Sequence, residues 1–415
     1  MYQAVRGTVD ILPAEQPYWD HVRRIIARLA ERYGFARIDT PIFEDTALFR
    51  RAGEYTDIVQ KEMYTFDDRG GSSLTLKPEG TPAVCRAYLQ HGMQNLPQPV
   101  RLYYISPIFR YDRPQAGRYR QHHQFGCEAI GEADPAIDAE LIDMAMAFFG
   151  DLGLQGLSLV INSIGCRQCR AQYLNALKNY YAPQVSALCP DCAARLEHNP
   201  LRLLDCKQAR CQPAADRAPR SIDYLCPACR EHFTALEKYL HLLELPYRLD
   251  HRLVRGLDYY TRTVFEVQPP EEGGQSALGG GGRYDNLIEE LGGKPTPAAG
   301  FAAGIERIIL NLKRQGVAVP EAPAPTALIC HLGEAAKEAA FRLTASLRRA
   351  GVSCVFAAGN RSLKSQMRLA DSLKVKYAVI LGEEEVKTGT VTLRRLDGGT
   401  QTTVTLEKAT EILIH

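Results

Sequence analysis

The sequence predicts an α+β protein in which a strand-rich body carries an inserted, mostly helical module and is followed by a small α/β domain. Three observations support this. Residues 101–128 alternate as two strands joined by a basic loop. Eight of the twelve cysteines fall between residues 166 and 229, where the strand pattern stops. After residue 326, three short apolar strands alternate with two amphipathic helices, as in α/β domains.

The composition is that of a folded protein of two or three domains. The chain has 415 residues, of which 45% are hydrophobic and 24% are charged. No stretch approaches the roughly 20 apolar residues needed to span a bilayer, and the N-terminus lacks the apolar core of a signal peptide. We therefore expect a cytoplasmic protein that contacts no membrane. The net charge is only +2, which excludes a general polycation.

Helix and strand signals follow one another through the first part of the chain. Residues 15–33 show helical spacing and end before Gly34, a typical C-terminal cap. A strand-like run at 37–44 is broken by Pro41. Residues 74–89 predict a strand and then a helix, with Thr81 as N-cap and Pro82 at the first helical position. Asp134-Pro135 gives the same signal for a helix that reaches about Leu152.

The second half returns to strands after the cysteine-bearing stretch. Residues 252–267 are strand-rich, 277–293 predict a strand, a glycine loop and a helix, and 298–312 predict a strand that passes into a helix. A Pro- and Ala-rich linker lies within residues 317–326. We expect these segments: a strand-rich core at 1–164 and 246–318, an inserted module at 165–245, a linker at 319–325, and a C-terminal α/β domain at 326–415.

The four glycines at 279–282 do not match a common nucleotide-binding loop. They fit neither G-x-G-x-x-G nor a Walker A motif. They predict either a tight turn or a close approach of backbone to a ligand, and we favour the second. Side chains would then have to hold any triphosphate.

The hairpin at 101–128 supplies suitable side chains. Arg110, Arg113, Arg118 and Arg120 lie close together there. Neighbouring cations repel one another, so this cluster favours a polyanionic ligand. A nucleoside triphosphate and the end of a nucleic acid both meet that requirement.

The order of motifs resembles the histidyl-tRNA synthetases, a family of class II aminoacyl-tRNA synthetases. The matching motifs span nearly the whole chain: LKPEGT (76–81), FRYDRPQAGRYRQHHQFGCE (109–128), LVRGLDYYTRTVFE (253–266), GGGGRYDNL (279–287) and GFAAGIERI (300–308). The resemblance implies a six-stranded antiparallel catalytic sheet, an anticodon-binding C-terminal domain and a homodimer. It also implies ATP-dependent ligation of L-histidine to its tRNA through histidyl-adenylate, with release of AMP and pyrophosphate and with Mg²⁺ accompanying the ATP.

By the same resemblance, four arginines bind ATP. Arg110 matches the arginine on the α-phosphate and the substrate carboxylate, Arg118 the grip on the terminal phosphates, and Arg307 the third-motif arginine on the nucleotide. Arg255 matches an arginine special to the histidine enzymes that stabilises the α-phosphate. Arg110 and Arg255 are the expected catalytic residues. A surface arginine in a weak ion pair is the alternative for each one alone.

A second set is expected to bind histidine. Glu128 matches the carboxylate that reads the imidazole, and tyrosines match residues around the ring (Tyr259, Tyr260, Tyr284). Glu79, Thr81 and Gln124 match residues around the α-amino group. The adjacent His122 and His123 alternate across a strand, and we interpret them as structural or tRNA-facing rather than metal ligands.

The cysteine spacing indicates zinc. Cys189-x₂-Cys192 and Cys226-x₂-Cys229 form the best quartet for one structural Zn²⁺, although eight thiols could make two sites. Reduced buried cysteines or disulfides are the alternatives.

Two other functions compete with tRNA histidylation. A regulatory paralogue would sense histidine without charging tRNA, but such proteins lack the C-terminal domain and often the phosphate-binding arginines. A zinc-dependent nucleic-acid-binding protein would leave the motifs at 76–81 and 253–266 unexplained.

Overall fold

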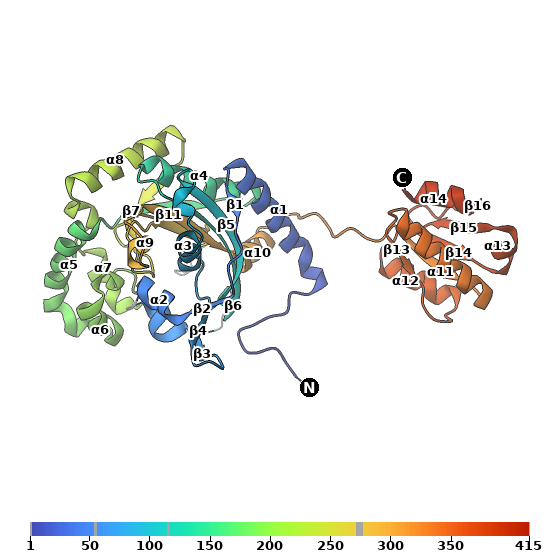
Figure 1. Ribbon diagram of the computed structural model, residues 1–415, viewed down its shortest axis with the longest axis horizontal. Coiled ribbons are helices and arrows are strands. Elements are labelled where there is room, and N and C mark those ends of the chain that lie inside the picture. The colour runs from blue at the N-terminus through green and yellow to red at the C-terminus, as the bar shows by residue number, and fades with distance from the viewer. Residues whose placement is uncertain (1, 54–55, 114–116, 271–276, 415) are drawn as a thin grey trace. The chain divides into compact units, whose positions relative to one another are not determined.

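The computed structural model describes residues 2–53, 56–113, 117–270 and 277–414, which form two compact units (Figure 1). The first unit is Met1–Pro320 and the second is Glu321–His415. Each has its own hydrophobic core, as expected for an α+β body followed by a separate domain.

An eight-stranded sheet is the centre of the first unit. Its strand order is β1-β5-β6-β11-β10-β9-β7-β8. The strands are β1 (Ala36–Arg37), β5 (Val100–Phe109), β6 (Gln121–Ile130), β7 (Ser158–Ser163), β8 (Tyr247–Leu249), β9 (Thr261–Gln268), β10 (Gly279–Arg283) and β11 (Ala298–Gly304). All neighbours from β5 to β7 are antiparallel, and only the edge strands β1 and β8 pair in parallel. The six central strands thus form the antiparallel sheet that the resemblance implied.

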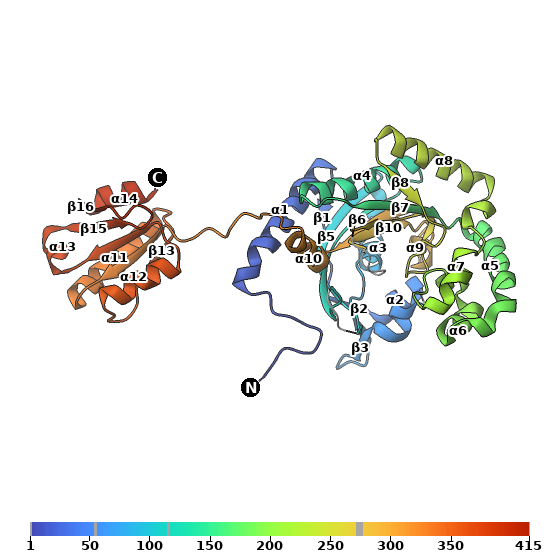
Figure 2. The same ribbon diagram turned by 180° about the vertical axis from the view of Figure 1, so that it is seen from behind.

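The two faces of this sheet are used differently. Helices α1 (Gln16–Arg32), α4 (Pro135–Asp151) and α10 (Ile305–Arg314) share one hydrophobic core with Phe125 and Phe301. Helices α3 (Thr81–Gln90) and α9 (Leu287–Glu290) lie on the other side, and both views place the strands between α4 and α3 (Figure 2). Because side chains alternate along β6, Phe125 enters the core while Gln124 and Glu128 face the opposite side.

A small sheet flanks this open face. Its order is β2-β4-β3, with β2 (Phe43–Asp45), β3 (Tyr64–Asp67) and β4 (Ser73–Leu76). The α-helix α2 (Thr46–Gly53) and the short helix η2 (Ile58–Glu62) connect β2 to β3. The run predicted at 37–44 is therefore split around Pro41 into parts of β1 and β2, which belong to different sheets.

The glycine loop predicted at 279–282 is wrong, because these residues form β10 in the middle of the sheet. A Cβ on Gly281 would lie 2.0 Å from the carbonyl oxygen of Gly300, and one on Gly282 would lie 2.2 Å from that of Thr263. The neighbouring strands therefore approach too closely for any side chain. The glycines serve strand packing rather than a turn.

The inserted module is mostly helical, as predicted. Its elements are α5 (Arg167–Tyr181), η4 (Ala182–Ala187), α6 (Pro190–His198), η5 (Pro200–Leu203), η6 (Ala209–Cys211), α7 (Gln212–Asp216), η7 (Ser221–Tyr224) and α8 (Pro227–Leu242). The module leaves the sheet after β7 and returns to it at β8. Because β7 and β8 pair in parallel, both ends of the module are anchored on one edge of the sheet.

A fully buried ion pair ties the sheet to α4. Arg283 Nη1 donates to Asp138 Oδ1 over 2.6 Å, and the Arg283 side chain has no exposed surface. Asp138 also contacts His232 Nε2 of α8 at 2.8 Å. Burial alone would raise the pKa of Asp138, but Arg283 and His232 overcome this and lower it. The ionised pair is therefore the resting state of this core.

The second unit is built on a five-stranded sheet of order β13-β12-β14-β15-β16. The three predicted strands are present as β12 (Ala327–His331), β13 (Cys354–Phe356) and β14 (Tyr377–Leu381), and the two predicted helices as α11 (Glu334–Arg349) and α12 (Leu363–Ser372). The sequence did not predict α13 (Glu383–Thr388), the hairpin β15 (Thr390–Arg395) and β16 (Gln401–Thr405), or α14 (Leu406–Ile414). Among the described residues, no helix could span a membrane.

Candidate active site

A cavity of about 1580 Å³ opens on the face of the large sheet opposite α4. Strands β6, β9, β10 and β11 supply its floor, and residues 253–260 and part of the inserted module supply its rim. All but one of the predicted ATP- and histidine-binding residues line it: Glu79, Thr81, Arg110, Arg118, Gln124, Arg255, Tyr259, Tyr260, Tyr284 and Arg307. The exception, Glu128, lies just beneath the surface.

Glu128 is a buried carboxyl group surrounded by hydroxyl donors. Its Oε1 accepts from Thr81 Oγ1 at 2.7 Å and from Tyr104 Oη at 3.3 Å, and its Oε2 accepts from Tyr284 Oη at 2.5 Å. Burial raises the pKa of Glu128 to about 7, although the three hydroxyl groups lower it in part. Near neutral pH this group can therefore either accept or donate a proton.

Two glycines provide the space that Glu128 and its neighbour Tyr104 occupy. A Cβ on Gly300 would lie 2.0 Å from Glu128 Oε2. A Cβ on Gly126 would lie 2.3 Å from Cζ of Tyr104. The backbones of β11 and β6 thus leave room for a carboxyl group and a phenol on the sheet face.

Glu79 is a second buried carboxyl group in the same cavity. It precedes α3, and its Oε2 accepts from Tyr259 Oη at 2.6 Å. Burial raises the pKa of Glu79 to about 7, and the Tyr259 hydroxyl and then Arg110 oppose the rise. A positively charged group entering the cavity would find two carboxyl groups here.

The N-cap role predicted for Thr81 is wrong. Helix α3 begins at Thr81 itself, with Gly80 as the N-cap. The Thr81 hydroxyl instead donates to Glu128, so it belongs to the cavity rather than to the helix end. The prediction for the next helix is confirmed, because Asp134 Oδ1 accepts from the backbone N–H of Ala136.

Aromatic rings line the cavity beside these carboxyl groups. The rings of Tyr259 and Tyr260 lie 5.0 Å apart, and those of Tyr259 and Tyr284 lie 5.8 Å apart. All three side chains are nearly buried, which raises the pKa of each phenol and keeps it protonated. The result is a pocket with apolar walls and a few fixed polar groups, which suits a small aromatic ligand.

Three arginines form a cationic side of the cavity. Arg307 Nε donates to the carbonyl of Gly117 at 2.9 Å, and Arg110 Nε donates to that of Pro78 at 2.8 Å. Arg118 lies 3.5 Å from Asp112. Burial, Arg118 and Arg110 all lower the pKa of Arg307. This mutual repulsion would be relieved by an anion bound among them.

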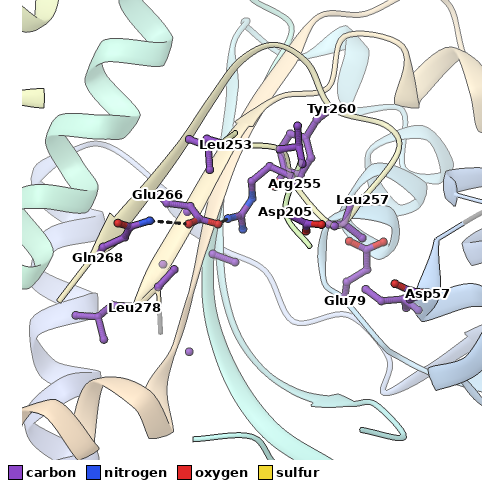
Figure 3. Close-up of a pocket in the computed structure, with 18 of the residues that line it drawn as sticks. Asp57, Glu79, Asp205, Leu253, Arg255, Leu257, Tyr260, Glu266, Gln268 and Leu278 are labelled. Atoms are coloured by element: carbon purple, nitrogen blue, oxygen red, sulfur yellow. Dashed lines mark hydrogen bonds and ion pairs between the residues drawn. The ribbon is translucent and has the colours of Figure 1, made fainter. Parts of the chain in front are cut away.

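Arg255 lines the same cavity, in contact with Glu266 (Figure 3). Glu266 also accepts from Gln268 Nε2 at 3.3 Å, so the three side chains follow one another along β9 and the loop before it. Burial would lower the pKa of Arg255, but Glu266 overcomes this and raises it. A Cβ on Gly280 would lie 2.9 Å from Arg255 Nη1, so this glycine of β10 leaves the guanidinium its space.

Sequence reasoning did not assign a role in the cavity to Tyr104, Glu266 or His122. Tyr104 and Glu266 contact predicted residues directly, and His122 lines the wall. A signal existed for Glu266, a single acidic residue in the otherwise apolar or neutral run that follows Arg262. No comparable signal existed for Tyr104, because tyrosines are common in buried strands.

The adjacent histidines point to opposite faces of β6, as predicted. His123 Nδ1 lies 2.9 Å from Glu306 Oε1 of α10, and the His123 ring packs edge-on against Trp19 of α1. His122 faces the cavity, where burial and then Arg110 and Arg307 lower its pKa to about 3. A neutral His122 is thus an uncharged neighbour of the arginines.

The predicted zinc quartet is wrong in its grouping. Cys189 and Cys192 lie with Cys206 and Cys211, whereas Cys226 and Cys229 lie with Cys166 and Cys169. The sequence pattern favoured two identical C-P-x-C motifs, but α6 and α8 begin in different parts of the module and each meets another cysteine pair. None of the twelve cysteines, which all lie within the described residues, forms a disulfide.

Comparison with known proteins agrees with this geometry. The family profile described as histidyl-tRNA synthetase matches residues 7–308, and the profile described as anticodon binding domain matches residues 326–415. The histidine–tRNA ligase of Dehalococcoides mccartyi strain BAV1 is 59% identical over 98% of both chains. That of Desulforamulus reducens is 50% identical over 97% of this chain and 96% of its own.

A solved structure is similar over its full length. The crystal structure of apo histidyl-tRNA synthetase from S. aureus has a TM-score of 0.84 and 37% sequence identity, with 100% of both chains covered. The sheet order, the arginine-lined cavity and these matches agree with one another. The chain therefore belongs to the histidyl-tRNA synthetase family.

Proposed function

We propose that this chain ligates L-histidine to its tRNA in two steps and that both take place in the cavity described above. One observation carries this proposal: the cavity joins buried carboxyl groups ringed by tyrosines to a set of arginines that repel one another. The first part suits an amino acid with an aromatic, titratable ring, and the second suits a triphosphate.

The reaction transfers an acyl group through an adenylate. An oxygen of the histidine carboxylate attacks the α-phosphorus of ATP, and the bond to the β-phosphate oxygen breaks, which releases pyrophosphate. A ribose hydroxyl at the 3′ end of the tRNA then attacks the acyl carbon, loses its proton, and displaces AMP. Negative charge develops on phosphate oxygens in both steps, so positioning and electrostatic stabilisation dominate catalysis.

The arginines divide between the two ends of the triphosphate in this proposal. Arg110 and Arg255, which both line the cavity, stabilise the α-phosphate. Arg118 and Arg307 hold the terminal phosphates, which their mutual repulsion in the free enzyme supports. The planar guanidinium groups can bind phosphate oxygens in pairs.

Glu128 receives the imidazole of histidine in this proposal. A ring N–H donates to its carboxylate, while Tyr284 and Thr81 fix the carboxylate orientation. Glu79 lies where it can accept from the α-ammonium group, with Gln124 as a further polar contact and Tyr259 and Tyr260 beside the ring. Amino acids that cannot bond with Glu128 would leave it buried and unsatisfied, which provides specificity.

Magnesium would accompany ATP. Mg²⁺ in nucleotide sites is bound by phosphate oxygens together with one or two carboxylates. Glu62, Asp112 and Glu266 line the cavity among its arginines and fit this requirement. The ion would neutralise phosphate charge when bound.

The second unit is assigned to the tRNA anticodon. Arg361, just before α12, and Lys364 and Arg368 within it are exposed, whereas Ala370 is buried, and such basic side chains can contact phosphates. We also propose a homodimer, as the sequence resemblance implies. Ile42 and Phe43, exposed by 47% and 51%, are candidates for its interface. The cytoplasmic location stays a prediction from the sequence.

The two competing functions have less support. A histidine sensor without tRNA charging does not need residues 326–415, which match the anticodon-binding profile. A nucleic-acid-binding protein centred on the cysteine module would not account for the match over residues 7–308.

Histidine-dependent exchange of pyrophosphate into ATP tests the proposal directly. We expect exchange with histidine and none with the nineteen other amino acids, followed by charging of histidine tRNA. Arg101→Lys is a suitable control, because Arg101 belongs to the same hairpin but pairs with Glu140 outside the cavity. Histidine binding without exchange would favour the sensor, and exchange with another amino acid would contradict the pocket assignment.

A further inference from the structure

The inserted module brings its eight cysteines together in two separate groups. The base quartet is Cys166, Cys169, Cys226 and Cys229, and the rim quartet is Cys189, Cys192, Cys206 and Cys211. Within each quartet all four sulfur atoms lie within 4.8 Å of one another. The other four cysteines of the chain, all buried, belong to neither group (Cys85, Cys127, Cys330, Cys354).

The sulfur spacing matches that of a metal-bound tetrahedron. A tetrahedral zinc with Zn–S bonds of about 2.3 Å places its sulfurs about 3.8 Å apart. In the base quartet, Cys166 Sγ lies 3.6 Å from Cys169 Sγ and 4.0 Å from Cys226 Sγ. In the rim quartet, Cys189 Sγ lies 3.8 Å from Cys206 Sγ. A disulfide would require about 2.05 Å, so these contacts are not disulfides.

Two helix N-termini meet at the base quartet. Cys166 is the N-cap of α5 and Cys226 is the N-cap of α8, and their partners Cys169 and Cys229 lie in the first turns. The backbone N–H of Cys226 donates to Cys169 Sγ over 3.1 Å. Two positive helix ends that face one another are unfavourable unless negative charge lies between them. Four thiolates around a divalent cation supply a net negative charge, whereas four neutral thiols do not.

The rim quartet has the same kind of support and is more deeply buried. Cys189 is the N-cap of α6, and its Sγ accepts from the backbone N–H of Cys192 at 3.4 Å. The N–H of Cys189 donates to Cys211 Sγ at 3.2 Å. All four cysteines are buried. Backbone N–H groups directed at sulfur are expected where the sulfur is a thiolate.

We propose that the inserted module binds two Zn²⁺ ions, one in each quartet, and that both are structural. Four thiolates are a donor set that selects zinc among the common divalent ions. Each quartet supplies four protein ligands and leaves no open position, which is the mark of a structural rather than a catalytic site. The sequence pattern alone favoured a single ion bound by one cysteine pair from each quartet.

The two ions would stabilise different contacts of the module with the rest of the first unit. Beside the base quartet, Arg170 of α5 donates to the carbonyls of Asp258 and Tyr260 in the loop that carries cavity residues. Near the rim quartet, Arg195 of α6 pairs with Asp57 at 2.8 Å. Asn199, just after α6, donates to the Asp258 carboxylate at 2.8 Å. The base ion would thus stabilise the contact of α5 with the loop before β9, and the rim ion would stabilise the contacts of α6 and Asn199 with Asp57 and Asp258.

Metal counting on the full chain tests the number of sites. We expect two zinc ions per chain by mass spectrometry after gel filtration, one in Cys169→Ser, one in Cys192→Ser and none in the double variant. Cys354→Ser is the matched control, a buried cysteine of the second unit outside both quartets, and should retain two. Replacement by Co²⁺ should give the visible spectrum of tetrahedral thiolate coordination at the same stoichiometry.

Hydrogen exchange tests the assignment of each ion. Cys192→Ser should increase exchange in residues 190–205 and leave residues 227–242 unchanged, and Cys169→Ser should do the reverse. If a serine variant does not fold, Co²⁺ titration of the metal-stripped wild-type chain still counts the sites.

A folded wild-type chain with no metal, or with one ion per chain, would overturn the proposal. A zinc content that stays at two in Cys192→Ser would overturn the rim site. Because pyrophosphate exchange is measured independently, an active chain without zinc would refute this inference and leave the proposed function intact.

Discussion

Replacement of Glu128 by glutamine should weaken histidine binding selectively. The variant keeps the shape of the side chain, and an amide oxygen at the Oε1 position could still accept from Thr81 and Tyr104. The amide nitrogen would then replace Oε2, to which Tyr284 donates. The ionised acceptor proposed for the imidazole N–H is lost. A hydrogen bond to a charged group contributes about 1.5–3 kcal/mol, so KM for histidine should rise about 10- to 150-fold.

Pyrophosphate exchange separates this effect from general damage. KM for histidine is measured at saturating ATP, and KM for ATP at saturating histidine. Since Glu128 lies beneath the tyrosine side of the cavity and forms no ion pair with the arginines, KM for ATP should change less than about 3-fold. Equal losses for both substrates would show that Glu128 supports the whole cavity and does not read the imidazole.

Four further predictions follow from the same structure. Arg255→His should reduce pyrophosphate exchange about 100- to 1000-fold with an unchanged circular dichroism spectrum, and normal exchange would remove its assigned role. Asp138→Asn should lower the free energy of unfolding of the first unit by about 3–5 kcal/mol, because Arg283 would lose its main buried counterion. Urea unfolding monitored by the fluorescence of the single tryptophan measures this loss, and a value below about 1 kcal/mol would mean that the ion pair is not needed for stability. Gly281→Ala should cost about 3 kcal/mol or more in the same assay, since its Cβ would lie 2.0 Å from a carbonyl oxygen of the neighbouring strand; a stable variant would contradict the observed strand spacing. The pKa of Glu128 is raised from 4.5 to about 7, so the folded state binds this proton more tightly than the unfolded state does. The free energy of unfolding of the wild type, measured relative to Glu128→Gln, should therefore fall by roughly 3 kcal/mol as the pH rises from 4.5 to 7. A difference between the two proteins that does not depend on pH would refute the raised pKa.

Local signals in the sequence were sufficient for most elements of the fold. Helix α1 and its end at Gly34, the hairpin of β5 and β6, and the Asp134 cap all depend on residues that are neighbours in the chain. Local hydrogen bonds and hydrophobic periodicity determine such features, so a single sequence reveals them.

Features that depend on distant neighbours were not predictable in this way. The glycines of β10 form a strand because β9 and β11 pair with them on either side, and the sequence of the segment itself does not indicate these partners. Thr81 has the chemistry of an N-cap, but Glu128, 47 residues away, receives its hydroxyl. Which cysteine pairs come together in one quartet likewise depends on how the inserted module folds. The hairpin of β15 and β16 was missed because its strands are short and mostly polar.

The cavity residues were located mainly by family motifs rather than by physical reasoning. Charge clustering pointed to Arg110 and Arg118, but Arg255 and Glu128 are single charged residues with no local signal of function. Their importance emerges only when β6, β11, β10 and β9 lie in that order in one sheet, which brings a carboxyl group and a guanidinium to one face of it.

If Arg255 binds the α-phosphate as proposed, its contact with Glu266 implies an exchange of ionic partners during turnover. Because Glu266 already neutralises this guanidinium in the free enzyme, an arriving phosphate replaces one anion by another and gains little binding energy from the cation. We infer that the ion pair with Glu266 keeps the Arg255 side chain in position for the reaction and lowers the affinity of the free enzyme for ATP. Arg255 would then stabilise mainly the transition state, in which the α-phosphorus is bonded to five oxygens. The added negative charge on those oxygens would attract the guanidinium more strongly than Glu266 does.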